Sequence, residues 1–223
     1  MAGRGTRTQN EYSVPKPLIF TKDRPLFSWA LQGLPLEIAS DLTFVTNKSV
    51  GNNPIFLHYL ETYVPKNLKA RTLIIDNETS GQAETVLLGL GKVPKSNGLL
   101  IFNCDTFISD NFPRIYSQWD GILGSYPSTD PSMSYIEVDS MQVLRTAEKA
   151  VISPLASTGL YFFKNKDLFL EAYEKTPHTA ETYVAPMYNY LIEQGLAITY
   201  FETQKFVPLG TPQEITSFEF ESK

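Results

Sequence analysis

The chain has 223 residues, of which 19 are basic and 24 are acidic, so its formal net charge is -5 at pH 7. This length suits one large domain or two very small ones, and it allows a sizeable core. A net acidic chain disfavours generic nucleic-acid binding, because such binding neutralises phosphates with Lys and Arg. The longest apolar runs, such as residues 99–102, are far shorter than the ~20 residues of a membrane span.

Residues that form disulfides or bind zinc are scarce. Cys104 is the single cysteine, so an intrachain disulfide is excluded and a reducing compartment is the default. One cysteine and two histidines also leave no zinc site of the usual kind. We therefore expect a soluble, cytoplasmic, globular protein with neither a membrane nor a nucleic-acid partner.

Runs with strand character alternate with helical patterns along the chain. Strands are expected at Leu42–Thr46, Thr72–Ile75, Gly98–Asn103, Ser134–Val138, Gln142–Thr146, Thr158–Phe163 and Ala197–Phe201. Helices are expected at Leu26–Leu34, Pro54–Tyr63, Gln82–Leu90, Lys166–Lys175 and Thr182–Gln194. The alternation predicts βα units and a mostly parallel sheet, and consecutive strands from about Trp119 to Phe163 should add antiparallel pairs. No linker divides the chain, so one α/β domain is expected over residues 1–223.

The N-terminal stretch has the composition of a phosphate-binding loop. Glycines such as Gly3 and Gly5 allow close approach to a phosphate, whose oxygens consecutive N–H groups can bind. Arg7 and Lys16 would add the positive charge that a triphosphate requires. The first 24 residues hold five basic and two acidic side chains, a local charge of +3. The same composition also fits a solvated basic terminus, because glycine loops are weak motifs.

A set of short motifs follows in order along almost the whole chain. They are Ala2-Gly3-Arg4-Gly5-Thr6-Arg7 with Lys16-Pro17-Leu18, Gly81-Gln82-Ala83-Glu84-Thr85, Asn103-Cys104-Asp105-Thr106, Glu148-Lys149, Ala156–Phe163 and Gly210-Thr211-Pro212. In this order they resemble the sugar-phosphate nucleotidyltransferases, the group that includes the glucose-1-phosphate thymidylyltransferases. Each motif alone is weak, whereas the ordered set is specific. The chain looks most like the small single-domain members found in bacterial capsule and surface-polysaccharide gene clusters.

The resemblance implies a fold and a reaction. The fold would be that of the nucleotide-diphospho-sugar transferases, a GT-A-like and Rossmann-like α/β architecture whose mixed, mostly parallel sheet is flanked by helices. The reaction would be attack by a sugar-1-phosphate, or a similar small phosphorylated acceptor, on the α-phosphorus of an NTP with release of pyrophosphate. The product would be a precursor of capsule or other surface polysaccharide. The base of the NTP, the acceptor and a homo-oligomeric state are left open.

The resemblance also assigns roles to individual residues. Nucleotide binding would involve Ala2, Gly3, Gly5, Thr6, Arg7, Gly81 and Gln82. The catalytic residues would be Arg7, Lys16 and Asp105, with Asp105 as the ligand of a Mg2+ cofactor. The acceptor would contact Glu148, Lys149, Thr158 and Gly159.

The residue types suit these roles, and each also has a simpler interpretation. Asp105 follows an apolar run, so its carboxylate should emerge at the carboxyl end of a strand, where open α/β sheets bind ligands and where Mg2+ could accept it. It could equally be a turn or cap residue. The Gln82 amide could read a base edge or be a polar residue at a helix start. Glu148 and Lys149 could be an exposed surface pair. Cys104 is expected to be a small buried hydrophobe.

Two features depart from the family pattern. The family has a central strand immediately before its glycine loop, whereas this sequence begins at the loop. We therefore expect that the first strand lies upstream of residue 1, and the alternative is a sheet with a central gap. Pro208 stands where many relatives have an aspartate that is a second metal ligand. Binding of Mg2+ would then depend on Asp105, phosphates and water, or on a carboxylate elsewhere such as Glu202.

Two alternative functions stay open: a GT-A-type glycosyltransferase that uses a nucleotide-sugar, and a catalytically impaired nucleotide-binding regulatory module.

Overall fold

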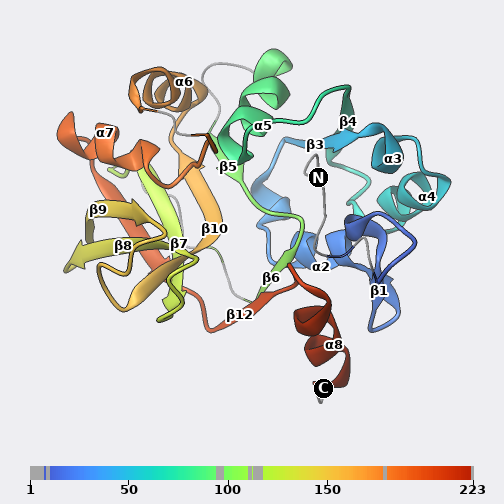
Figure 1. The fold of residues 1–223 in the computed structure, drawn as a ribbon. Helices are drawn as coiled ribbons and strands as arrows, with labels where there is room; N and C mark the ends of the chain where they lie inside the picture. Colours follow the sequence, from blue (N-terminus) through green and yellow to red (C-terminus); the bar gives the residue numbers. More distant parts are fainter. Residues whose placement is uncertain are drawn as a thin grey trace. The chain divides into compact units, whose positions relative to one another are not determined.

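The computed structural model describes residues 8, 11–93, 98–109, 112, 118–177 and 180–221 (Figure 1). The chain folds into two compact units, each of which combines segments from distant parts of the sequence. Unit 1 comprises Met1–Thr79, Asn103–Phe112 and Lys205–Lys223. Unit 2 comprises Ser80–Phe102 and Pro113–Gln204. The two units are described separately below, and a single domain over residues 1–223 stays a prediction.

The described part of unit 1 contains short helices and three two-stranded sheets. Its elements are η1 (Lys16–Leu18), β1 (Phe20–Thr21), β2 (Arg24–Pro25), α2 (Leu26–Gln32), η2 (Leu36–Ile38), β3 (Asp41–Asn47), α3 (Lys48–Gly51), α4 (Pro54–Tyr63), β4 (Lys69–Ile75), β6 (Thr106–Ser109), β12 (Lys205–Pro208) and α8 (Pro212–Phe220). β3 and β4 pair in parallel, whereas β1 with β2 and β6 with β12 pair antiparallel. Local signals fix the helix starts: the Asn53 side chain accepts a hydrogen bond from the N–H of Ile55, and Pro54 is the first helical residue of α4.

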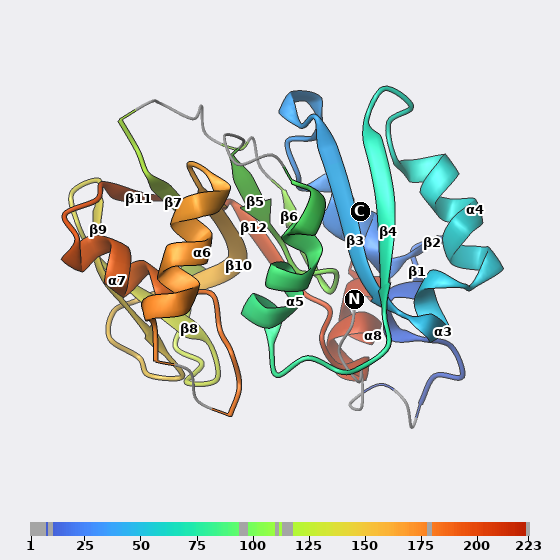
Figure 2. The ribbon, with the colours of Figure 1, turned by 90° about the horizontal axis from the view of Figure 1, so that it is seen from above.

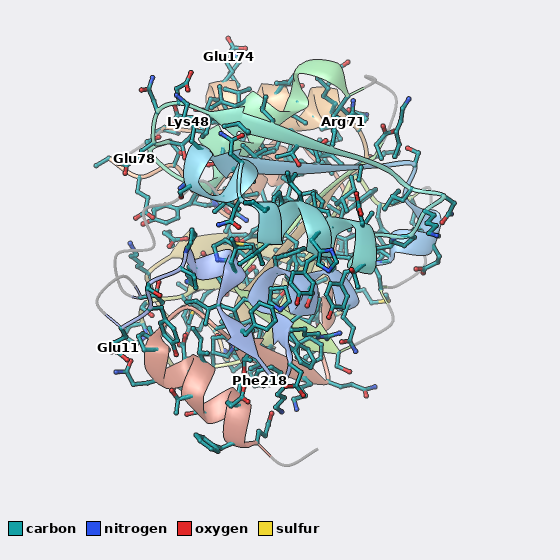
Figure 3. All side chains as sticks on the ribbon, turned by 90° about the vertical axis from the view of Figure 1, so that its right-hand side faces the viewer. Glu11, Lys48, Arg71, Glu78, Glu174 and Phe218 are labelled. Atoms are coloured by element: carbon teal, nitrogen blue, oxygen red, sulfur yellow. The ribbon has the colours of Figure 1, made fainter. Side chains whose placement is uncertain are left out.

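Aromatic side chains form the core of unit 1. Phe27, Phe44 and Phe56 pack edge to face with one another and are nearly inaccessible to solvent. A second aromatic group attaches α8 to the rest of unit 1. Phe218 of α8, labelled in Figure 3, packs against Trp29 and Phe107. Edge-to-face pairs of this kind add stability beyond the area that they bury.

Unit 2 is one sheet covered by helices. Its elements are α5 (Gln82–Gly89), η3 (Leu90–Lys92), β5 (Leu99–Ile101), β7 (Gly121–Pro127), β8 (Ser134–Asp139), β9 (Gln142–Glu148), β10 (Leu155–Phe163), α6 (Lys166–Lys175), α7 (Met187–Glu193) and β11 (Ile198–Glu202). The strand order is β11-β7-β10-β8-β9, with β5 paired to β10 as well. α6 and α7 lie over the sheet in Figure 2, and Phe169 and Tyr188 from these helices pack with Phe163 of β10.

The expected α/β architecture with mixed strand pairing is confirmed, but most of the described strand pairs are antiparallel, whereas a mostly parallel sheet was expected. Among the described strands, β3–β4 and β7–β11 are parallel pairs, and the other pairs are antiparallel. The antiparallel share is large because β10 pairs in that sense with β5, β7 and β8. No helix in the described part of the chain is long and apolar enough to cross a membrane.

Each expected strand and helix occurs in the structure, although some bounds differ. α4 and α6 have the expected bounds, whereas the last expected helix begins at Met187 instead of Thr182. β7 lies in the region where consecutive strands were expected, but no bounds were predicted for it because Gly121 and Gly124 lower its strand propensity. Both glycines are required by packing: a Cβ on Gly121 would lie 2.7 Å from the Tyr188 ring, and one on Gly124 would collide with the Thr158 hydroxyl.

Candidate active site

Asp105 and Lys16 form an ion pair in unit 1. Asp105 lies in the turn before β6, where the N–H of Leu209 donates to its backbone carbonyl over 2.9 Å. Lys16 is the first residue of the 3-10 helix η1, and its ammonium lies 2.6 Å from the Asp105 carboxylate. The side chains are 15% and 32% exposed, so the pair is partly shielded from water while the carboxylate keeps an accessible side. The sequence assigned both residues to the catalytic site, and the structure brings them together.

The Gly-Thr-Pro motif lies beside Lys16 in the same unit. Thr211 caps α8, and the Glu214 carboxylate accepts hydrogen bonds from the N–H groups of Gly210 and Thr211 over 2.7 and 2.8 Å. A Cβ on Gly210 would lie 3.2 Å from Glu214 Oε2 and 3.7 Å from Lys16 Nζ. Glu214 was missed as a site residue, although the Thr-x-x-Glu capping-box pattern identifies it in the sequence.

Asp105 can act as a magnesium ligand only together with oxygens from the substrate or from water. Within the described residues, no group of three or more His, Cys, Asp or Glu side chains could hold a metal ion. Pro208 pairs with Thr106 between β12 and β6 and brings no ligand atom from its side chain. One carboxylate fits Mg2+, which commonly binds one or two carboxylates and completes its shell with phosphates and water.

Cys104 precedes the carboxylate and is only partly buried, which corrects the expectation of a buried position. Desolvation of the thiolate raises the pKa of Cys104 above its ordinary value. A raised pKa keeps the thiol protonated at neutral pH, so Cys104 is unsuited to a nucleophilic role.

The Gln82 segment of unit 2 is tied to the segment 180–184 by backbone hydrogen bonds. The N–H of Ala83 donates to the Thr182 carbonyl, and the N–H of Thr182 donates to the Ser80 carbonyl, each over 3.1 Å. A Cβ on Gly81 would lie 2.7 Å from the Thr182 nitrogen, so glycine is required by this close approach. Gln82 itself is half-buried at the first position of α5.

The Glu84 carboxylate closes the first turn of the same helix. It accepts hydrogen bonds from the Ser80 hydroxyl over 2.7 Å and from the Ser80 N–H over 2.5 Å. These bonds lower the pKa of Glu84 because they favour the charged carboxylate.

Glu148 ends β9 in a group of hydroxyls. The Ser134 hydroxyl donates to the Glu148 carboxylate across the β8–β9 pair. Burial raises the pKa of Glu148, although the Ser134 hydrogen bond and Lys149 act in the opposite direction. Tyr161 lies close enough for the charge of Glu148 to affect it, and burial raises the pKa of Tyr161 to about 12. Ser134 and Ser157 both hydrogen-bond to Tyr161, so Ser134 is a shared partner of the Glu148 carboxylate and the Tyr161 hydroxyl.

Lys149 follows Glu148 with a left-handed backbone, at φ +52°. Its N–H donates to the Met133 carbonyl over 3.0 Å, which holds this uncommon conformation in place. The ammonium donates to the Tyr183 hydroxyl and lies 3.3 Å from the Glu181 carboxylate. The hydrogen bond to Tyr183 is the main cause that raises the pKa of Lys149.

Thr158 and Gly159 lie inside the sheet of unit 2. Thr158 is 2% exposed, and Gly159 has a φ of +81° where the pairing of β10 with β7 shifts register between Ser157 and Tyr161. A left-handed residue at a bulge explains the glycine. Their contact with an acceptor stays a prediction.

A search with family models gave no match, and no curated protein matched. Solved structures do match. The nucleoside-diphosphate-sugar pyrophosphorylase of Vibrio cholerae RC9 is 32% identical, with 98% of this chain and 97% of that chain covered and a TM-score of 0.87. The chain belongs to the sugar-phosphate nucleotidyltransferase family.

Two further structures share the fold of this nucleotidyltransferase at lower identity. A Bacillus anthracis protein assigned as a glucose-1-phosphate thymidylyltransferase is 18% identical, covering 98% of this chain and 91% of that chain with a TM-score of 0.81. The inositol-1-phosphate CTP transferase of T. maritima is 13% identical, covering 100% of this chain and 95% of that chain with a TM-score of 0.76.

Family membership confirms the predicted enzyme class, and the residue roles stay predictions. The structure joins Lys16 to Asp105 in unit 1, and it joins the Gln82 segment to the Lys149 environment in unit 2. The predicted nucleotide-binding and catalytic residues of the N-terminal loop lie outside the described part of the nucleotidyltransferase. They are Ala2, Gly3, Gly5, Thr6 and Arg7.

Proposed function

We propose that the protein joins the nucleotidyl group of an NTP to a sugar-1-phosphate and releases pyrophosphate, in the cytoplasm, to make a precursor of capsule or other surface polysaccharide. The observation that carries this proposal is the 32% identity to a nucleoside-diphosphate-sugar pyrophosphorylase over 98% of the chain. The chemistry of the described residues supports it, because nucleotidyl transfer depends on positioned charges and needs no covalent nucleophile.

The Glu148 carboxylate and the hydroxyl side chains near it favour binding of an acceptor that is rich in hydroxyls. A carboxylate accepts hydrogen bonds from sugar hydroxyls, and the hydroxyls of Ser134, Ser157 and Tyr161 both donate and accept them. Lys149, the next residue, offers an ammonium with three donors, which suits the phosphate of the same acceptor. We therefore infer that this part of unit 2 binds the sugar-1-phosphate.

In the proposed reaction, an acceptor phosphate oxygen forms a bond to the α-phosphorus of the NTP. The bond from that phosphorus to the oxygen bridging to the β-phosphate breaks, and pyrophosphate leaves with the electron pair. Gln82 would hold the base with its amide, and Lys149 would orient the attacking phosphate. Lys16 would neutralise negative charge beside Asp105. Mg2+, held by Asp105, would supply further neutralisation of the phosphate charges.

The decisive test is a matrix of the four common NTPs against several sugar-1-phosphates, with pyrophosphate as the readout. Pyrophosphate should appear only when both substrates are present, and chelation of Mg2+ should stop it. Release of a nucleoside diphosphate from a nucleotide-sugar would instead identify a GT-A-type glycosyltransferase. Nucleotide binding without any turnover would identify a regulatory module.

A further inference from the structure

The tripeptide Glu181-Thr182-Tyr183 contacts the two ligand-binding segments of unit 2 at once. Thr182 is bonded to the Ser80–Glu84 segment, which carries Gln82. Its neighbours in the chain contact Lys149: Glu181 forms an ion pair with it, and Tyr183 accepts a hydrogen bond from it. None of the three residues belongs to the ordered set of family motifs in the sequence.

The contact with Lys149 is a closed triangle of polar groups. The Lys149 ammonium donates to the Tyr183 oxygen, the Tyr183 hydroxyl donates to the Glu181 carboxylate, and that carboxylate lies 3.3 Å from the ammonium. Each bond polarises the next, so a triangle restrains the ammonium better than one exposed pair. The Lys149 ammonium also lies 4.9 Å from the centroid of the Tyr183 ring, within the range of a cation–π contact.

The backbone and the side chain of Lys149 are each held in place by neighbouring groups. Its φ of +52° costs energy for a residue with a Cβ, and such conformations persist where the surroundings fix them. The side chains of Lys149 and Glu181 are each 55% exposed and Tyr183 is half-buried, so an unrestrained lysine would sample many rotamers. The ammonium has three donors, and its contacts with Tyr183 and Glu181 leave it able to bind a phosphate oxygen.

The contact with the Gln82 segment is built from both backbone and side chain. Besides the two backbone hydrogen bonds, the Thr182 hydroxyl lies 3.2 Å from the Ser80 hydroxyl and accepts from the Glu84 N–H over 3.3 Å. Thr182 is 5% exposed, so these bonds are protected from water. The hydroxyl therefore helps to fix the first turn of α5, at which Gln82 lies.

We propose that Glu181-Thr182-Tyr183 is a positioning segment that orients Lys149 toward the acceptor phosphate and Gln82 toward the base. This proposal rests on the proposed function for the identity of the two ligands. Loss of the Tyr183 hydroxyl should therefore weaken binding of the acceptor selectively. Loss of the Thr182 hydroxyl should weaken binding of the nucleotide selectively.

The kinetic test compares Tyr183→Phe and Thr182→Val with the wild-type chain. Tyr183→Phe should raise the KM of the acceptor ~3- to 10-fold while the KM of the NTP stays within about twofold. Thr182→Val should show the reverse pattern, and Thr182→Ser should restore wild-type values because it keeps the hydroxyl. Tyr190→Phe is the matched control, since Tyr190 makes the same kind of bond to Glu171 and lies outside this segment. Equal changes in both KM values for Tyr183→Phe, or none, would overturn the proposal.

A second measurement needs no substrate and so separates this proposal from the proposed function. NMR titration of the Lys149 Cε and Nζ resonances, assigned with Lys149→Arg, should give a lower pKa in Tyr183→Phe than in the wild type. The direction follows because the bond to Tyr183 is the main cause of the raised pKa. An unchanged Lys149 titration would refute the positioning role even if pyrophosphate release is observed. A lowered pKa in a chain that releases no pyrophosphate would refute the proposed function alone.

Discussion

The Lys16 ammonium and the Asp105 carboxylate, 89 positions apart in the chain, form an ion pair of 2.6 Å in unit 1. The pair joins a basic residue of the N-terminal segment to the carboxylate that the sequence assigns to the metal. The two side chains are only 15% and 32% exposed, so the cost of removing their charges from water offsets much of the attraction between them. The value of the arrangement is therefore chemical: it holds a cation and a potential metal ligand at one place.

Asp105→Asn should abolish nucleotidyl transfer and leave the fold intact. The amide keeps the shape of the side chain and loses the charge that would bind Mg2+, so kcat should fall ~10²-fold or more. Steady-state rates with saturating substrates measure this loss, and the Tm should change by a few degrees at most. Glu221→Gln is a control, since it removes the carboxylate of the exposed pair with Lys205 in the same unit. Wild-type rates in Asp105→Asn would remove this residue from the mechanism.

Lys149→Ala should weaken the acceptor more than the nucleotide. The acceptor phosphate would lose a charged hydrogen bond, which is worth ~1.5–3 kcal/mol where it is shielded and less at an exposed site. Separate KM values for the NTP and the sugar-1-phosphate measure the effect. Lys164→Ala serves as the control, because Lys164 forms an ion pair with Asp120 on a different part of unit 2. The same increase in both KM values would identify Lys149 as a general surface charge.

Glu148→Gln should alter the pH dependence of stability. Burial raises the pKa of Glu148 in the folded chain above its value in the unfolded chain, so the folded state binds the proton more tightly. The cost of ionising the buried carboxylate is absent below the unfolded pKa, and it grows as the pH rises through the window between the unfolded and folded pKa values. The free energy of unfolding of the wild type, relative to Glu148→Gln, should therefore decrease as the pH rises through that window.

Urea unfolding of both proteins from about pH 4 to 7 measures this difference, and subtraction removes the contribution of every other titrating group. Wild-type stability that increases relative to Glu148→Gln over the same range would contradict the raised pKa.

Gly81→Ala should lower the stability of the fold and also weaken nucleotide binding. The new Cβ would lie 2.7 Å from the Thr182 nitrogen, so the Ser80–Glu84 and 180–184 segments would have to separate. Overpacking of this kind costs ~1–3 kcal/mol. Gly91→Ala is the matched control, because a Cβ there meets no atom within 4 Å. Comparable unfolding midpoints for the two variants would show that the contact between Gly81 and Thr182 relaxes without cost.

Local sequence signals predicted some elements fully and others not at all. The bounds of α6 follow from the Asn165 cap, whose side chain accepts from the N–H of Leu168, and from the apolar spacing behind it. β7 escaped prediction because its glycines are required by Tyr188 and Thr158, which lie far away in the sequence. α8 was not predicted, although the capping box of Thr211 and Glu214 marks its start in the sequence.

The candidate site divides in the same way. Asp105, Glu148 and Lys149 were proposed as site residues because they lie in motifs, whereas Glu181 and Tyr183, which contact Lys149, lie in none. Tyr183 lies 34 positions from Lys149, and the contact depends on a left-handed backbone that strand alternation does not anticipate. Contacts of this kind depend on tertiary structure, which residue spacing does not encode.

The central claim is nucleotidyl transfer, and phosphorus NMR of a reaction mixture tests it most directly. The wild-type chain with Mg2+, an NTP and a sugar-1-phosphate should convert the triphosphate and sugar-phosphate resonances into pyrophosphate and a new diphosphate diester. The two products should form in equal amounts, and neither should form with Asp105→Asn. Unchanged spectra for every NTP and acceptor pair, or inorganic phosphate as the sole product, would contradict the claim.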